Sequence, residues 1–248
     1  MLFRSRGRAR RHDHRHERRD VPAADDRLPG DGGRCKSYSR RRVISSTREA
    51  RVRQARLAES VTVLKGCFGA DPFSFAGEHY TITDYDAQPK PVQQPHPPFF
   101  IGGGGRTTLE LAAREAQTVG FAPRILRGGV PDPRSFTWAA TEEKIGWVRE
   151  AAGERFDELT LNVYPSFWPV TVTDDLDGEA GKVAAALLER SGIELTVPEV
   201  IDSPHIFIGS HDRFVEKFTE LRDRLGISSF LIGDLDQLGP VVEQLAGT

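Results

Sequence analysis

The sequence is poor in the residues and runs that mark several protein classes. Only two of its 248 residues are cysteines, Cys35 and Cys67, too few for a disulfide framework or a four-cysteine zinc site. It has no run of about 18 apolar residues, the length that a membrane-spanning helix requires. Its arginine-rich start is followed by no apolar segment of the ~7–15 residues that a secretory signal needs. We therefore expect a cytoplasmic protein with no membrane segment.

Charge is divided unevenly along the chain. Residues 1–56 hold 18 basic and 7 acidic side chains, whereas residues 57–248 hold 16 basic and 29 acidic ones. The first segment shows no apolar periodicity before about residue 43, so it cannot bury enough surface to offset its conformational entropy. We expect residues 1–46 to be a basic segment that is disordered or translated out of frame, and residues 47–248 to be the folded domain.

Three functions are conceivable for this basic segment, and none is favoured. A nucleic-acid-binding arm is the best of them, but acidic residues interrupt the basic run and only two aromatic side chains could stack on bases. His12, His14 and His16 lack a nearby fourth metal ligand. Arg18 and Arg19 lack the apolar core of a twin-arginine export signal. We expect neither a metal site nor a nucleic-acid partner, and keep a basic-arm nucleic-acid-binding protein as an alternative.

Regular periodicity begins near residue 47. The Ser46-Thr47-Arg48-Glu49 stretch has the spacing of a helix capping box, and apolar residues at steps of three and four predict a helix that Gly66 closes. The apolar positions are Leu57, Val61, Leu64 and Phe68. Two short aromatic and β-branched runs within residues 72–82 then predict a hairpin, and a proline-rich crossing follows over residues 89–98.

From residue 98 onward the pattern alternates between strands and helices. The predicted strands are 99–101, 118–122, 159–167 and 228–232. The predicted helices are about 109–116, capped by Thr107 or Thr108, then 138–152, 179–190, 211–224 and 236–246. Strands separated by helices favour parallel pairing with right-handed crossovers, so the predicted class is α/β.

The most informative motif is Phe-Phe-Ile-Gly-Gly-Gly-Gly-Arg-Thr-Thr. Four glycines, Gly102 to Gly105, allow the backbone to approach a ligand, and the following helix offers unpaired N–H groups to an anion such as phosphate. Arg106 would add a charged contact. The motif is no Walker loop, because no Lys-Ser/Thr pair follows, and Thr107 stands where a dinucleotide fingerprint has its third glycine. A tight strand-to-helix turn without a ligand is the simpler alternative.

A series of motifs carries a family resemblance. The stretch PKPVQQPHPPFFIGGGGRTTLELAAREAQTVGFAPR, with RLAESVTVLKGCFG and FAGEHYTI before it, resembles the middle of the luciferase-like oxidoreductases. The stretch SPHIFIGSHDRFVEKFTELRDRLGISSFLIGDL resembles that family's ending. The resemblance covers about residues 52–248 and is strongest to the branch that uses the deazaflavin coenzyme F420.

The resemblance implies a (β/α)8 TIM barrel of which this chain carries strands five to eight. It implies an F420- or FMN-dependent oxidoreductase or monooxygenase that transfers hydride to or from a small organic molecule, with F420 expected over FMN. Cofactor-binding residues would be Gly102, Gly103, Gly104, Gly105 and Arg106, with Ala122 and Pro123 nearby. No catalytic residue is implied, because the family's first four strands have no counterpart here. The alternative is an inactive truncated or frame-shifted half-barrel, and a homodimer could close such a half-barrel.

Other polar and aromatic residues have stronger structural than catalytic interpretations. Ser210 is expected to cap a helix rather than act as a nucleophile, and Asp174 and Asp175 to begin the preceding helix. Glu78 and His79 could be polar groups of a cleft lid, and His96 is expected at the surface. The other residues considered are His205 and His211, which flank the Gly209-Ser210 turn, and the core or rim aromatics Trp138, Trp147 and Trp168.

Overall fold

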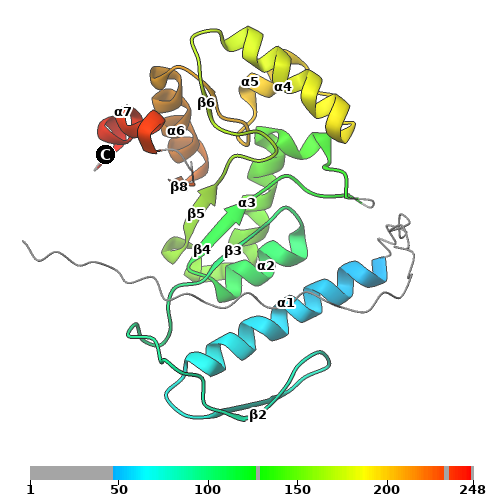
Figure 1. The fold of residues 1–248 in the computed structure, drawn as a ribbon, viewed down its shortest axis with the longest axis vertical. Coiled ribbons are helices and arrows are strands. Elements are labelled where there is room, and N and C mark those ends of the chain that lie inside the picture. Colours follow the sequence, from blue (N-terminus) through cyan, green and yellow to red (C-terminus); the bar gives the residue numbers. More distant parts are fainter. Residues whose placement is uncertain (1–46, 127–128, 232–234, 247–248) are drawn as a thin grey trace, which may run out of the picture. The chain divides into compact units, whose positions relative to one another are not determined.

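The computed structural model describes residues 47–126, 129–231 and 235–246 (Figure 1). The expectations for residues 1–46, among them disorder, an out-of-frame origin and the basic arm, lie outside the described residues, as does the Ser46 capping position. All described residues fall within one structural unit, Val43–Thr248. In the part of the chain that the structure describes, no helix is both long and apolar enough to cross a membrane.

The described chain opens with helix α1 (Thr47–Phe68), followed by the antiparallel strands β1 (Phe73–Ala76) and β2 (Thr81–Tyr85). The expected hairpin is therefore confirmed. The expected helix end at Gly66 is wrong, because α1 continues beyond it. The glycine instead makes room for the Phe73 ring, which a Cβ at position 66 would overlap. Close packing, not helix termination, explains this glycine.

Glu59 of α1 fastens the hairpin to the helix. Its carboxylate accepts hydrogen bonds from the backbone N–H groups of Glu78 and His79, each at 2.9 Å, and of Tyr80 at 3.1 Å. Desolvation raises the pKa of Glu59, but the three backbone donors outweigh it, so this pKa lies below its ordinary value. Glu78 and His79 are thus part of the hairpin turn that α1 holds.

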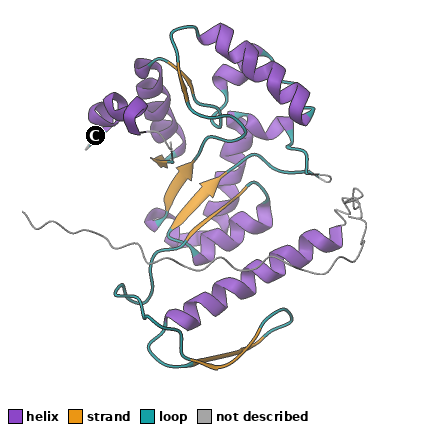
Figure 2. Cartoon of the chain, in the orientation of Figure 1, coloured by secondary structure: helices purple, strands orange, loops and turns teal. Residues whose placement is uncertain are grey.

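The main sheet has four parallel strands with helices between them (Figure 2). The strands, in spatial order, are β3 (Phe100–Gly103), β4 (Thr118–Phe121), β5 (Thr160–Val163) and β8 (Ile227–Phe230). Helix α2 (Arg106–Glu115) follows β3, the 3-10 turn η1 (Pro133–Phe136) and helix α3 (Trp138–Ala152) follow β4, and the 3-10 turn η2 (Gly153–Glu158) follows α3. Helix α7 (Leu235–Leu245) follows β8.

The connection from β5 to β8 is the longest in the sheet. It contains β6 (Thr171–Val172), α4 (Leu176–Ser191), α5 (Val197–Asp202), β7 (Ile208–Gly209) and α6 (His211–Leu225). Strands β6 and β7 pair in parallel outside the main sheet. The α/β class and the parallel pairing expected from the sequence are confirmed.

The two faces of the sheet differ. Side chains of Ile101, Val119, Leu161 and Ile227 are buried in one core with residues of α2, α3, α6 and α7. Because side chains alternate along a strand, the neighbouring positions point the other way. On that second face Phe100 and Gly102 are exposed, whereas Asn162 is buried.

Several element boundaries differ from the sequence expectation. The strand predicted to reach residue 167 ends at Val163, since Pro165 lacks the N–H that a continuing ladder needs. Neither Thr107 nor Thr108 caps α2, whose N-cap residue is Gly105. Asp175 does cap α4, as expected, by accepting a hydrogen bond from the Gly178 backbone N–H at 3.0 Å.

Candidate functional site

The four glycines end β3 and lead into α2, but they are not equivalent. A Cβ at Gly104 would overlap the carbonyl oxygen of Pro123 and lie 2.7 Å from that of Ala122, so only glycine fits there. A Cβ at Gly103 would meet the Thr108 side chain at 2.9 Å. A Cβ at Gly105 would meet nothing within 4 Å. The turn is therefore packed tightly at Gly104 and open at Gly105.

The N-terminus of α2 is left uncapped by side chains. Gly105 has extended backbone angles (φ −108°, ψ 146°) and offers no side-chain acceptor to the first N–H groups of the helix, and the first turn carries no acidic residue. The first N–H groups of a helix have no partner within it, and the helix dipole places partial positive charge there. Together with the open space at Gly105, this end of α2 can accept an anionic group.

Arg106, the fifth predicted cofactor-binding residue, is held elsewhere in this structure. Its guanidinium donates to Glu110 Oε1 at 2.7 Å and to Glu150 Oε2 of α3 at 3.0 Å. The hydrogen bond to Glu110 and the nearby charge of Glu150 raise the pKa of Arg106. The side chain links two helices, and its contact with a cofactor stays a prediction.

The end of β4 forms one wall of the glycine turn. The Ala122 backbone N–H donates to the Gly103 carbonyl at 3.0 Å, and the carbonyls of Ala122 and Pro123 face Gly104. The structure thus brings Ala122 and Pro123 beside the turn.

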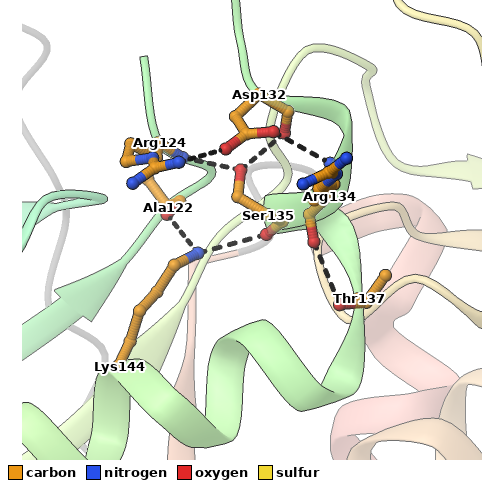
Figure 3. Close-up of polar contacts among 7 residues, drawn as sticks. All are labelled: Ala122, Arg124, Asp132, Arg134, Ser135, Thr137 and Lys144. Atoms are coloured by element: carbon orange, nitrogen blue, oxygen red, sulfur yellow. Dashed lines mark hydrogen bonds and ion pairs between the residues drawn. The ribbon is translucent and has the colours of Figure 1, made fainter. Parts of the chain in front are cut away.

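A polar cluster that the sequence analysis missed lies behind this wall (Figure 3). Arg124 donates to Asp132 Oδ2 at 2.5 Å, and the Ser135 hydroxyl donates to the Asp132 carbonyl at 2.7 Å. Lys144 of α3, only 2% exposed, donates from Nζ to the carbonyls of Ala122 at 2.8 Å and Ser135 at 3.1 Å. The cluster ties the β4–α3 connection to the strand end.

The charges of this cluster perturb one another. Burial, and then repulsion by Arg124, lower the pKa of Lys144 to about 8, although Asp132 and Glu143 act in the opposite direction. Desolvation raises the pKa of Asp132, but donors from Arg124 and Arg134 outweigh it and leave that pKa lowered. The sequence did carry a signal for Lys144: it falls on the buried stripe of α3 with Thr141, Ile145 and Val148.

A concavity of about 200 Å³ opens beside the cluster. Its lining residues are Gly104, Arg124, Asp132, Arg134, Ser135, Ala140, Glu143, Lys144 and Trp147. It therefore joins the glycine turn to the charged cluster.

The remaining histidines and Ser210 have structural surroundings. His205 is fully buried with Nε2 3.1 Å from Thr141 Oγ1, and burial followed by repulsion from Lys144 and Lys217 holds its pKa well below the usual value. His211 Nε2 lies 2.8 Å from the Gln237 carbonyl oxygen. Ser210 caps α6 as expected, accepting from the Arg213 backbone N–H at 3.3 Å.

The other cleft candidates are distributed over the fold. His96 packs on the Phe99 ring with a centroid distance of 4.7 Å, and the Trp138 indole N–H donates to the Asp202 carbonyl at 2.7 Å. The buried Trp168 indole N–H has no hydrogen-bond partner among the described residues. Over the same residues, no three His, Cys, Asp or Glu side chains form a group that could hold a metal ion.

Comparison with known proteins identifies the family. The model of the luciferase-like monooxygenases matches residues 40–237. The chain belongs to this luciferase-like monooxygenase family. The family membership, and an α/β fold with a parallel sheet that matches luciferase-like TIM-barrel structures, confirm the resemblance seen in the sequence.

Two sequence relatives of this luciferase-like chain are named FMNH2-dependent dimethylsulfone monooxygenases. The protein from Pseudomonas putida is 44% identical over 62 residues, covering 25% of this chain and 17% of the relative. The protein from Pseudomonas fluorescens (strain Pf0-1) is 36% identical over 145 residues, covering 57% of this chain and 34% of the relative. The chain thus matches about a third or less of these relatives' length.

Solved structures share the fold at low sequence identity. The coenzyme F420-dependent tetrahydromethanopterin reductase from Methanopyrus kandleri has a TM-score of 0.56 at 15% identity, covering 77% of this chain and 62% of that one. An F420-dependent secondary alcohol dehydrogenase has a TM-score of 0.54 at 15% identity, covering 79% and 61%. EDTA monooxygenase from Chelativorans sp. BNC1 has a TM-score of 0.52 at 13% identity, covering 81% and 61%.

Proposed function

We propose that this chain binds a flavin or deazaflavin at the carboxyl ends of β3 and β4 and supports oxidation or reduction of a small organic molecule. The observation that carries the proposal is the glycine turn: Gly104 is packed against the end of β4, while Gly105 leaves the N-terminus of α2 open. In parallel α/β sheets, ligands bind at the carboxyl ends of the strands.

The residues at this edge fit a phosphate-bearing cofactor. The first N–H groups of α2 would hold the phosphate, because neither a side-chain cap nor an acidic residue of the first turn competes for them. Gly102 and Gly120, paired across β3 and β4, leave room for the exposed Phe100 ring, which lies 2.8 Å from the position of a Cβ at Gly120. A bound reduced flavin or deazaflavin supplies the electrons, and the chain supplies binding and orientation.

A buried amide on the same face of the sheet is a further candidate for ligand contact. Asn162 Nδ2 donates to Ser229 Oγ at 2.9 Å, while Asn162 Oδ1 is buried with no hydrogen-bond partner among the described residues. A buried acceptor without a donor costs about 1–3 kcal/mol. A ligand N–H or hydroxyl that reached it would recover this energy and orient the ligand.

We favour reduced FMN as the cofactor and keep F420 as the alternative. The relatives named as FMNH2-dependent are 36–44% identical over the matched segments, whereas the F420-dependent structures are about 15% identical and share the fold. This weakens the preference for F420 expected from the sequence. Small sulfones are the first substrates to test.

Binding of FMN, FMNH2 and F420 to the purified chain, followed by fluorescence, tests this proposal. Gly105→Val should weaken binding at least tenfold without loss of thermal stability, since a Cβ at this position has no neighbour within 4 Å. Gly146→Val, at a second position with no neighbour within 4 Å but on α3, is the matched control and should bind as the parent chain does. Failure of the folded chain to bind any of the three would favour the inactive half-barrel.

A further inference from the structure

Lys144 is a buried lysine whose hydrogen-bond partners are neutral. Its Nζ binds two backbone carbonyls, and no carboxylate of the described residues lies within ion-pair distance of it. Asp132, the buried acid of the cluster, is engaged by Arg124 instead. Burying an ammonium group without a counter-ion costs free energy. We therefore ask what the two carbonyls that it holds contribute to the structure.

One of those carbonyls belongs to the wall of the glycine turn. Ala122 accepts from Lys144 through its oxygen and donates to Gly103 through its N–H, at 2.8 and 3.0 Å. The same Ala122 oxygen would lie 2.7 Å from a Cβ at Gly104. A short series of contacts therefore runs from the ammonium of α3 through Ala122 to the turn that precedes α2.

We propose that Lys144 is a positioning residue of the cofactor site, because the Ala122 carbonyl that it holds forms the wall on which the Gly103-Gly104 turn rests. Without the ammonium, the end of β4 and the turn lose a common anchor, and the open end of α2 loses its fixed geometry. This inference rests on the proposed function for its effect on cofactor binding, but its effect on the turn is independent of any cofactor.

The geometry also predicts a dependence on pH. Arg124, Arg134, Asp132 and Glu143 line the concavity around Lys144, and its charge helps to keep His205 neutral. Burial lowers the pKa of Lys144 in the closed structure to about 8, so opening of the turn, which exposes this side chain, takes up a proton between this value and the ordinary 10.5. The turn should therefore open less, and cofactor affinity should rise, as the pH increases through this value.

Hydrogen exchange at the Ala122 amide measures the turn directly, because this N–H donates to Gly103. In Lys144→Met its protection factor should fall at least tenfold at pH 7 and become insensitive to pH between 7 and 9, whereas in the parent chain it should rise over that range. Lys217→Met is the matched control. Lys217 is the second buried lysine, it holds the carbonyls of Ile201 and Ile206, and its loss should leave Ala122 unchanged.

Unchanged protection of Ala122 in a folded Lys144→Met chain would overturn the inference, whatever the cofactor does. If this variant does not fold, Lys144→Arg replaces it. A guanidinium keeps its charge at pH 9, so retained protection without pH dependence supports the inference, and a pH dependence like that of the parent overturns it.

Titration of the same variants with FMN and F420 at pH 7 and 9 separates this inference from the proposed function. Loss of Ala122 protection together with at least tenfold weaker cofactor binding in Lys144→Met supports both. Loss of protection when even the parent chain binds neither cofactor supports the part of the inference that concerns the turn and rejects the proposed function. Loss of protection with unchanged binding shows that the turn moves but does not position the cofactor, which overturns the inference.

Discussion

Among the described residues, the β3–α2 and β7–α6 turns both lead from a strand through glycine into a helix, but they begin the helix differently. At β3–α2 the N-cap is Gly105, which has no side chain, and a methyl group placed there would have no neighbour within 4 Å. At β7–α6 the N-cap is Ser210, whose hydroxyl accepts the Arg213 N–H, and Asp212 follows in the first turn. The second helix satisfies its own positive end, whereas the first has neither a side-chain cap nor an acidic residue in its first turn.

Gly104→Ala should give the largest effect, because it attacks the packing that the open turn depends on. The methyl group would overlap the Pro123 oxygen, a backbone atom that cannot turn aside. We expect a loss of about 1–3 kcal/mol in the free energy of unfolding and at least tenfold weaker cofactor binding. Gly105→Ala is the control and should leave the urea unfolding midpoint unchanged. Equal unfolding midpoints for the two variants would contradict the conclusion that the turn is packed tightly at Gly104 and open at Gly105.

Gly105→Asp should convert the open turn into a capped one. An aspartate at this N-cap stabilises α2 by about 1 kcal/mol and places negative charge where the cofactor's phosphate would bind. Thermal stability should therefore rise while FMN affinity falls about tenfold. The converse change, Ser210→Ala, should cost about 1 kcal/mol and leave FMN affinity alone. A stabilised Gly105→Asp chain with undiminished affinity would show that the phosphate binds elsewhere.

The buried lysines near the two turns should make stability depend on pH. Burial lowers the pKa of Lys217 to about 7, and burial lowers that of Lys144 to about 8, from an ordinary value of 10.5. Between these values and 10.5 the unfolded chain binds more protons than the folded one, so the free energy of unfolding increases as the pH rises. Urea unfolding at pH 7, 8.5 and 9.5 should show this rise. Lys217→Met should reduce the pH dependence of the free energy of unfolding more than Lys144→Met does. An identical pH dependence in the parent and both variants would refute the lowered pKa values of these two lysines.

Arg106→Gln should give the smallest effect. The Arg106 guanidinium is exposed and shared between Glu110 and Glu150, and exposed ion pairs contribute little to stability. We expect no measurable change in Tm and less than threefold change in FMN affinity. A tenfold loss of affinity would show that this side chain leaves its helix partners to contact the bound cofactor.

The sequence predicts features that depend on near neighbours along the chain. The helix over 138–152, the caps at Asp175 and Ser210 and the parallel strand–helix alternation all follow from local periodicity or from polar residues three positions apart. The glycine turn is also visible in the sequence, although its role in packing is not. A glycine that serves a cap and one that serves a close approach look alike in sequence.

Features that depend on distant residues are not predictable in the same way. Lys144 binds a carbonyl 22 positions away, and Arg106 pairs with Glu150, 44 positions away. The sequence pattern indicates a helix end at Gly66 because the reason for this glycine, the Phe73 ring, lies on another element. Such contacts follow from the packing of elements, which periodicity alone does not determine.

The pairing of β6 with β7 brings the two ends of the long excursion between β5 and β8 together. Residues 173–207 leave the sheet region through one of these short strands and return through the other. They supply most of a second hydrophobic cluster, with Val183, Leu187, Ile193 and Val200 among its buried members. The return half of this segment is tied to the rest of the fold, because His205 bonds Thr141 of α3 and Lys217 of α6 holds the carbonyls of Ile201 and Ile206. Since loop-closure entropy changes only slowly with length, an insertion near α4 should cost less stability than one between Ile201 and Ile206.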